Sequence, residues 1–554
     1  MRMIWIRQLL RALPLAGLLS APESPASDSS WLATGASAEQ TALMDARAKH
    51  AEMAHDPSIQ LDVNQLDRIT RADAYVATEQ ASVDSDPLKP MFHIMAAAGS
   101  TGDPNGLIYA KGKYHVFFQH SPYMVWGKPV AEWPEGKVGP QVSWGHVSSV
   151  DGVYWQHEPI AIMPQPGSYD PGLCASGSAV MADDGTPTIF YTAAEPQTQC
   201  IARSQDPNLR YWRKDPNNPI LYEPKINNFR KGGFRDPFLW REGKTWNLIT
   251  CGATTDQGGM AVHFQSENLT NWTHVGALAE GMGPHCVAWE CPTFMRFGDQ
   301  SVLVVSPLFD NLQDTDHAPR GSVSYTIGPY KNGSTFTPGE WKPLDIGSPN
   351  DFYATQCLKT PDGRYLLWSM IIGGGSPGHN WSGKLSLPRV ITVRPDGLLG
   401  QAPAPELKQL RRAHWGKTNL DLAGEHTLAI KSATCEIIAE IEIGTAKVVG
   451  LDVRASDDFS TKTRISYDVS RSILDISGHK AGFKLLAGEH VLRLQVFVDR
   501  SVMEAFVNGR LCGTVQPFQD INDKAIRLFS EGGTARIRSV GIWEMGSVWA
   551  RPAQ

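Results

Sequence analysis

The sequence predicts an all-β chain that folds as a five-bladed β-propeller followed by a C-terminal β-sandwich. Three observations lead there. A strand–turn–strand pattern begins near residue 90, it recurs in five units over about 300 residues, and a second all-β block follows a short helix-like stretch. We therefore expect the β-propeller over residues 90–400, a linker over 401–417 and the β-sandwich over 418–554.

Five runs carry the propeller prediction, each with β-rich residues on both sides of a Gly, Pro, Asn or Asp turn. They span residues 106–119, 176–193, 236–252, 291–307 and 351–370. A second repeat interleaves with the first three units and places Trp155, Trp212 and Trp272 at matching positions. Because a four-stranded blade needs about 40–50 residues, five units over this length argue for five blades.

The sequence that follows the propeller also predicts strands. Residues 404–412 are helix-like and mark the linker, and residues 492–510 hold an alternating strand, a turn and another strand, which suits a β-sandwich. The motif VDRSVMEAFVNG contains Asp499, Arg500 and Glu504. We interpret it as a strand pair with an exposed charge cluster rather than as a catalytic site.

The N-terminus has the pattern of a signal peptide. Three arginines in the first eleven residues precede the apolar run 13–21, and small residues and proline follow. We expect a signal peptide over residues 1–26 and a secreted or periplasmic protein; the alternative is a disordered tail. The run is too short to span a membrane. Residues 27–89 form an N-terminal extension, rich in Ala, Asp, Glu and Gln, in which helix is expected and whose role the sequence does not indicate.

Composition narrows the class of function. The chain is 42% hydrophobic and 19% charged, as soluble globular proteins are, and its net charge of −6 argues against a nucleic-acid surface. Its eight cysteines form no CxxC pair and no zinc-type cluster appears, so neither a metal nor a cofactor is expected. Cys435 and Cys512 are candidates for a disulfide within one domain; free buried thiols are the alternative. Nothing indicates an oligomeric state.

The starts of the five repeat units carry the residues that point to chemistry. In a propeller the innermost strands line the central channel, so we expect Asp103, Ser176, Asp236, Glu290 and Asp351 to converge there. Three of them lie in the motifs GDPNG (102–106), FRDP (234–237) and WECP (289–292). Each motif alone is a common turn. Carboxylates brought together from separate repeats, however, raise one another's pKa and are what a glycosidase requires.

In this order the motifs resemble glycoside hydrolase family 32, the invertase, inulinase and levanase family. The resemblance covers about residues 92–554 and also rests on SWGH (143–146), YDPGLCASGS (169–178), DFYA (351–354), NWSGKLSLPR (380–389) and QAPAPEL (401–407). It implies the propeller and sandwich already predicted. It also implies hydrolysis or transfer of terminal β-D-fructofuranosyl groups, with retained configuration, from sucrose or from fructans such as levan and inulin.

The resemblance implies roles for particular residues. Asp103 is the expected nucleophile, Glu290 the general acid and then base, and Asp236 a carboxylate that hydrogen-bonds the fructose hydroxyls. For double displacement the carboxyl groups of Asp103 and Glu290 should lie roughly 5–5.5 Å apart, and Glu290 should titrate above the nucleophile. The positions that match family sugar contacts are Asn105, Gln119, Trp144, Ser176, Arg235 and Trp381. For the two tryptophans, core packing is the alternative.

One departure from the family pattern concerns the residue before the nucleophile. The family usually has Asn there, where it contacts the fructose, and this chain has Gly102. Three hypotheses therefore stay open: a β-fructosidase, a fructosyltransferase that uses the same residues, and a sugar-binding propeller that has lost catalysis. The three carboxylates speak against the last. Residues 125–138, with Trp126 and Trp133, resemble an insertion at the rim of the pocket.

Overall fold

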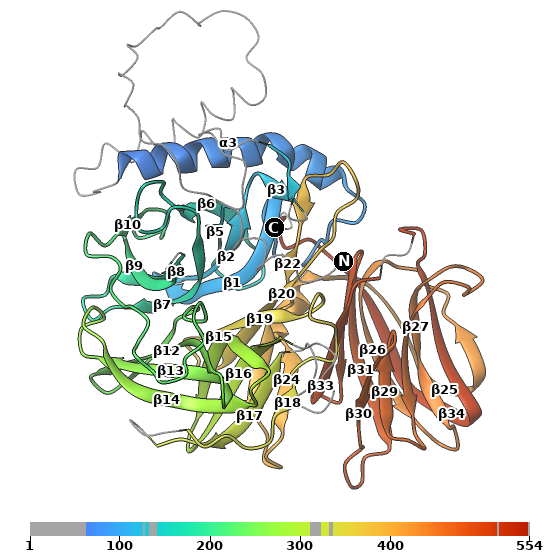
Figure 1. Cartoon of the computed structure of the whole chain (residues 1–554). Helices are drawn as coiled ribbons and strands as arrows, with labels where there is room; N and C mark the ends of the chain where they lie inside the picture. The colour runs from blue at the N-terminus through green and yellow to red at the C-terminus, as the bar shows by residue number, and fades with distance from the viewer. Residues whose placement is uncertain are drawn as a thin grey trace, which may run out of the picture.

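The computed structural model describes residues 62–125, 128–131, 141–194, 196–310, 323–331, 336–517 and 520–551. Within them the chain forms a β-propeller with a β-sandwich beside it, and a long helix that crosses the propeller (Figure 1). The all-β fold class predicted from the sequence is confirmed. The expected signal peptide, Trp126 and Trp133 lie outside the described residues.

Five antiparallel sheets make up the propeller, each described here from its innermost strand outward. The first three are β1 (Gly99–Ala110), β2 (Lys113–Ser121), β5 (Ser143–Ser149) and β6 (Gln156–Ile162); β7 (Cys174–Met181), β8 (Pro187–Ala193), β9 (Thr198–Ser204) and β10 (Trp212–Lys214); and β11 (Phe238–Glu242), β12 (Thr245–Thr254), β13 (Gly258–Ser266) and β14 (Thr273–Met282). The last two are β15 (Cys286–Phe297), β16 (Gln300–Phe309), β17 (Ser324–Pro329) and β18 (Lys342–Pro343); and β19 (Tyr353–Lys359), β20 (Tyr365–Ile371), β23 (Arg389–Val393) and β24 (Leu399–Pro403).

The two sequence repeats correspond to the inner and outer strands of these sheets. Each strand–turn–strand run covers the first two strands of one blade, whereas the repeated tryptophans stand at the outermost strands. Trp155 and Trp272 directly precede β6 and β14, and Trp212 begins β10. A blade that packs between two neighbouring blades is covered on both of its faces. Every residue of β8, in the second blade, is therefore buried.

The ring of blades closes through the innermost strands. β1 neighbours β7, β7 neighbours β11, β11 neighbours β15, β15 neighbours β19, and β19 returns to β1. Short strands complete the rim. β3 (Met124–Val125) pairs with β4 (Lys128–Pro129), β21 (Trp381–Ser382) runs parallel to the start of β1, and β22 (Lys384–Leu385) pairs with β20. The starts of the five innermost strands thus face one channel.

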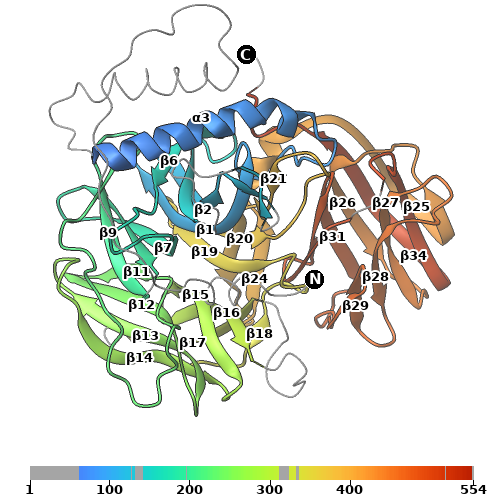
Figure 2. The same cartoon turned by 45° about the horizontal axis from the view of Figure 1, so that its top comes forward.

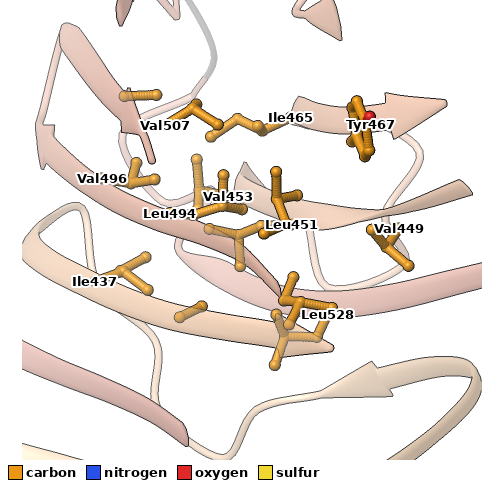
Figure 3. Close-up of a cluster of buried hydrophobic side chains, with 14 of the residues drawn as sticks. Ile437, Val449, Leu451, Val453, Ile465, Tyr467, Leu494, Val496, Val507 and Leu528 are labelled. Atoms are coloured by element: carbon orange, nitrogen blue, oxygen red, sulfur yellow. The ribbon is translucent and has the colours of Figure 1, made fainter. Parts of the chain in front are cut away.

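The β-sandwich is built from ten strands. They are β25 (Arg411–Thr427), β26 (Thr434–Glu442), β27 (Val448–Ala455), β28 (Thr463–Asp468), β29 (Ile473–Ile476), β30 (His479–Gly482), β31 (Val491–Asp499), β32 (Val502–Val507), β33 (Leu511–Val515) and β34 (Ala525–Met545). The long β34 belongs to both layers, because its first part pairs with β27 and its last part with β26. Leu451, Leu494 and Leu528 lie in the apolar layer between them (Figure 3).

The connection between the two domains is packed rather than free. A 3-10 helix, η1 (Pro405–Leu410), joins β24 to β25, and its Leu407 and Leu410 are buried. They share one apolar cluster with Phe118 of the propeller and Phe497 of the sandwich. This shared core fixes the sandwich against the propeller.

The two carboxylates of the VDRSVMEAFVNG motif are buried at this interface, so the predicted exposed charge cluster is wrong for them. Asp499 accepts hydrogen bonds from the backbone N–H groups of Met91 and Phe92 and contacts His93 Nδ1 at 2.7 Å. Glu504 pairs with Arg389 at 2.7 Å, and both side chains are fully buried. Because the β31–β32 hairpin turns these residues towards the propeller, each charge needs a partner from the other domain.

The described part of the N-terminal extension is the helix α3 (Val63–Ser85), which lies across the first blade (Figure 2). Asp62 caps its N-terminus by accepting from two backbone N–H groups. Ile69 and Ala72 pack against Ile160 and Met163 of the first blade. No helix in the ranges given above is long and apolar enough to cross a membrane.

All eight cysteines are buried and free, so of the two alternatives for Cys435 and Cys512 the structure has the free thiols. The two residues lie on β26 and β33, which β31 and β32 separate in the sheet. Three strand spacings are about 14 Å, twice the largest Cα–Cα distance that a disulfide spans.

Candidate active site

Three carboxylates meet at the channel from three different blades. Asp103 lies on β1, Asp236 two residues before β11 and Glu290 on β15. Cys291, which follows Glu290, joins the other two: its backbone N–H donates to Asp236 Oδ2 at 3.0 Å and its thiol contacts Asp103 Oδ2 at 3.7 Å. The convergence predicted from the repeat therefore holds for these three residues.

The backbone is irregular where the strands deliver these side chains. Strand pairing shifts register between Thr101 and Pro104, between Ala175 and Gly177, between Glu290 and Thr293, and between Tyr353 and Gln356. Asp236 and Cys291 adopt left-handed conformations with φ of 60° and 48°. Such bulges and strained residues redirect side chains and are typical of functional sites.

Asp103 is held by uncharged donors. The Ser176 hydroxyl donates to its Oδ2 at 2.5 Å, and Gln119 Nε2 donates both to the same oxygen at 3.2 Å and to Ser176 Oγ at 2.6 Å. Burial raises the pKa of Asp103 to about 7, against the hydrogen bond from Ser176, and the nearby charges of Asp236 and Glu290 raise it further. Asp103 is therefore a much weaker acid than an exposed aspartate.

Glu290 is held at both carboxyl oxygens. Arg235 donates to Oε1 from Nη2 at 2.7 Å and from Nε at 3.1 Å, while the Tyr353 hydroxyl contacts Oε2. The same guanidinium lies 3.8 Å from Asp236. Burial raises the pKa of Asp236 to about 6, with Arg235 opposing and Glu290 adding to the rise. The site thus combines one cation with three carboxylates.

Comparison with known proteins gives the family. The model described as Glycosyl hydrolases family 32 N-terminal domain matches residues 93–403, and that described as Glycosyl hydrolases family 32 C terminal matches residues 406–544. The chain belongs to glycosyl hydrolase family 32. It is therefore a glycoside hydrolase. The boundary between the two matched family domains falls where the propeller meets the sandwich.

Relatives and solved structures agree with this assignment. A sucrose-6-phosphate hydrolase of Bacillus subtilis is 31% identical over 462 residues, which cover 79% of this chain and 90% of the relative. A levanase of the same species is 27% identical, covering 87% of this chain and 74% of the levanase. The fructan 1-exohydrolase IIa of Cichorium intybus shares the fold, with a TM-score of 0.71 at 23% identity over 83% of this chain and 98% of the plant enzyme.

Two tryptophans predicted to contact sugar lie in the core of this family 32 propeller. Trp144 and Trp381 are both fully buried. The indole N–H of Trp144 donates to the Ala175 carbonyl at 3.0 Å, and that of Trp381 donates to Asp86 Oδ2 at 2.8 Å. Since neither ring exposes a face, their predicted sugar contact is wrong for this structure.

Two other predicted positions are held by contacts within the protein. Asn105 is fully buried, with its side-chain amide packed against the backbone of Gly177 in the neighbouring blade. Asp351 accepts from Ser348 and, at 3.0 Å, from Gln516 Nε2 of the sandwich side. The structure thus holds Asp351 against the sandwich, and the residue of this unit that contacts Glu290 is Tyr353.

Three contacts were not foreseen from the sequence. They are the hydroxyl of Tyr353, the backbone and thiol of Cys291, and Thr192 Oγ1, which accepts from the backbone N–H of Asp236 at 2.9 Å. Tyr353 and Cys291 do lie inside the quoted motifs DFYA and WECP, so the signal was present. What they contact depends on the bulges, which a motif does not encode.

Gly102 makes room for Gln119. A Cβ at position 102 would lie 2.9 Å from Gln119 Cβ, closer than side chains normally approach. The glycine therefore allows Gln119 to pack against the start of β1 while its amide reaches Asp103. The polar group that an asparagine would place beside the nucleophile is absent at this position.

Proposed function

We propose that this glycoside hydrolase is a retaining β-fructosidase that releases terminal β-D-fructofuranosyl units from sucrose or fructans by double displacement. The gathering of three carboxylates around Cys291, each with different partners, carries the proposal. The names of its relatives add the substrate class, since they include sucrose-6-phosphate hydrolases, a raffinose invertase and a levanase.

In the first step, Asp103 attacks the anomeric carbon of fructose while Glu290 gives a proton to the departing glycosidic oxygen. Glu290 Oε1 contacts the Arg235 guanidinium, which only donates, whereas Oε2 contacts the Tyr353 hydroxyl, which can donate or accept. Oε2 is therefore the oxygen suited to hold the transferable proton. The second step reverses these roles: Glu290 takes a proton from water, and the water attacks the fructosyl-enzyme.

Asp236 has a different part in this proposal. Its backbone N–H donates to Thr192 Oγ1, and its Oδ2 accepts from the Cys291 N–H. The remaining carboxylate oxygen is free of that bond and is suited to hydrogen-bond fructose hydroxyls. This hold strengthens as positive charge develops on the ring, which lowers the barrier rather than merely improving binding.

Product analysis on sucrose, sucrose 6-phosphate, inulin and levan tests the proposal. We expect free fructose from at least one of them, and a kcat lowered by at least about 10³-fold in Asp103→Asn and Glu290→Gln. Wild-type turnover no faster than that of the two variants would instead support a sugar-binding propeller without catalysis.

A second candidate, fructosyl transfer, is favoured by Gly102. Without a polar side chain at this position, the protein has one group fewer beside the nucleophile to hold a water, and a sugar hydroxyl can take its place. Incubation with concentrated sucrose separates the two activities. Release of glucose in excess of fructose, with short fructo-oligosaccharides, indicates transfer; equal release throughout excludes it.

A further inference from the structure

The carboxylate of Asp86 connects the N-terminal extension to the catalytic domain. Asp86 follows α3 and precedes residue 93, where the family 32 match begins, and its side chain is fully buried. It accepts hydrogen bonds from the backbone N–H of Ser376 at 2.8 Å, from the Ser376 hydroxyl at 2.7 Å and from Trp381 Nε1 at 2.8 Å. Three donors from one loop thus converge on one carboxylate from outside the matched domain.

The helix α3 adds two more bonds to the same segment, residues 372–381, which we name the β20–β21 loop. The Ser82 carbonyl contacts His379 Nδ1 at 2.8 Å, and Glu79 accepts from the side-chain amide of Asn380. Val83 and Trp381 are both buried in one apolar cluster. The β20–β21 loop therefore packs against the N-terminal extension through both polar and apolar contacts.

Both ends of the β20–β21 loop adjoin strands that carry the active site. At one end, Met370 of β20 is paired with Tyr353, the residue whose hydroxyl contacts Glu290. At the other end, Trp381 is paired with Gly99 at the start of β1, and the Gly99 N–H donates to the Asn380 carbonyl at 2.7 Å. The start of β1 leads directly to Asp103. The loop therefore connects β20, which pairs with the strand of Tyr353, to the start of β1, which leads to the nucleophile.

Close packing leaves the loop little freedom of its own. A Cβ at Gly374 would lie 2.6 Å from the Trp381 ring, and one at Gly383 would lie 1.9 Å from the Thr101 carbonyl oxygen. A displacement of Trp381 must therefore move the backbone on both sides of it. Since Asp86 holds the indole N–H, its removal acts on β1 through this packing.

We propose that Asp86 is a positioning residue for the active site, and that the N-terminal extension acts as a brace that sets the β20–β21 loop and the start of β1. Asp86 touches none of the three carboxylates. Its effect on the reaction is therefore on the placement of the nucleophile and of the bound sugar. The kinetic part of this inference rests on the proposed β-fructosidase function, whereas the structural part does not.

The test uses three full-length variants. Asp86→Ala removes all acceptors, Asp86→Asn keeps one acceptor oxygen, and Asp67→Ala is a matched control. Asp67 lies on the same helix but is exposed and pairs with Arg71, so its loss should change little. Hydrogen–deuterium exchange is followed over residues 63–85, 99–103 and 372–383. Thermal midpoints verify that each variant folds. The kinetic constants kcat and KM are measured on the fructoside that the wild-type protein cleaves best.

We expect Asp86→Ala to speed exchange in residues 372–383 and 99–103 while α3 stays protected, and to lower kcat/KM by about 10-fold to 100-fold, as small misplacements of catalytic groups do. Asp86→Asn should fall between wild type and the alanine variant, and the control should match wild type. Exchange and kinetics in Asp86→Ala equal to those of the control would overturn the proposal.

The two proposals fail in distinguishable ways. If Asp86→Ala does not fold, Asp86→Asn is compared with the control in its place. Exchange and kinetics in Asp86→Asn equal to those of the control would then overturn the proposal that the extension is a brace. If the wild-type protein cleaves no fructoside, the proposed function fails, and the exchange data alone decide whether Asp86 holds the loop and β1.

Discussion

Replacing Asp103 by asparagine should stabilise the folded protein above neutral pH while it removes activity. Burial and the neighbouring carboxylates raise the pKa of Asp103 from its ordinary value of 3.8 to about 7, so the charged form is disfavoured in the folded state. The stability that this group contributes is fully present below about pH 4 and is lost as the pH rises to about 7. Asparagine stays neutral, so it avoids that loss.

The magnitude follows from the size of the shift. A rise from 3.8 to about 7 is roughly three pKa units, which corresponds to about 4 kcal/mol at 1.36 kcal/mol per unit. Asp103 is only partly buried, so solvent screening reduces this to about 2 kcal/mol. The Ser176 hydroxyl can still donate to the amide oxygen, and no cavity forms because the two side chains have nearly the same shape.

Thermal unfolding of wild type and Asp103→Asn at pH 4 and pH 8 measures the effect, at one scan rate because a chain of this size can unfold irreversibly. We expect the variant to melt about 2–4 °C higher than wild type at pH 8, and the difference to shrink at pH 4. A variant that is less stable than wild type at pH 8, or a difference independent of pH, would refute the reasoning.

Three further predictions concern other contacts. Ser176→Ala removes the hydrogen bond that favours charged Asp103, so the pKa of Asp103 rises and the acidic limb of the kcat/KM profile moves to higher pH; a shift to lower pH would contradict this. Tyr353→Phe removes the hydroxyl at Glu290 and should lower kcat about 10-fold with little change in thermal midpoint; an unchanged kcat would exclude a role in proton transfer. Arg389→Met leaves two buried carboxylates at the domain interface without their cation and should destabilise the protein by about 3–5 kcal/mol in denaturant unfolding, whereas a loss under 1 kcal/mol would show that the cluster contributes little.

The sequence was sufficient for the blades and for the three carboxylates because both depend on local patterns. Strand–turn–strand repeats mark the inner strands, and Asp103, Asp236 and Glu290 stand at the same place in their repeats. Asp351 stands at a similar place, yet it lies in the turn before β19 and bonds to Ser348 and Gln516, whereas Tyr353 contacts Glu290. Bulges change which residue of a strand faces the channel, and they leave no reliable mark in a single sequence.

The other errors come from partners that are remote in the sequence. Trp381 was expected at the sugar, but its indole N–H is covered by Asp86, 295 positions away. Asp499 and Glu504 were expected on the surface, and their partner His93 lies more than 400 positions away. Burial of a polar side chain depends on the residues that pack on it, which local periodicity does not reveal.

The stereochemistry of transfer to methanol tests the central claim most directly. The protein is incubated with sucrose in aqueous methanol, and the methyl fructofuranoside product, which does not mutarotate, is identified by NMR. Attack by Asp103 followed by a second displacement predicts the β-anomer alone, and no product from Asp103→Asn. The α-anomer, or undiminished product from the Asp103 variant, would contradict a double displacement through Asp103.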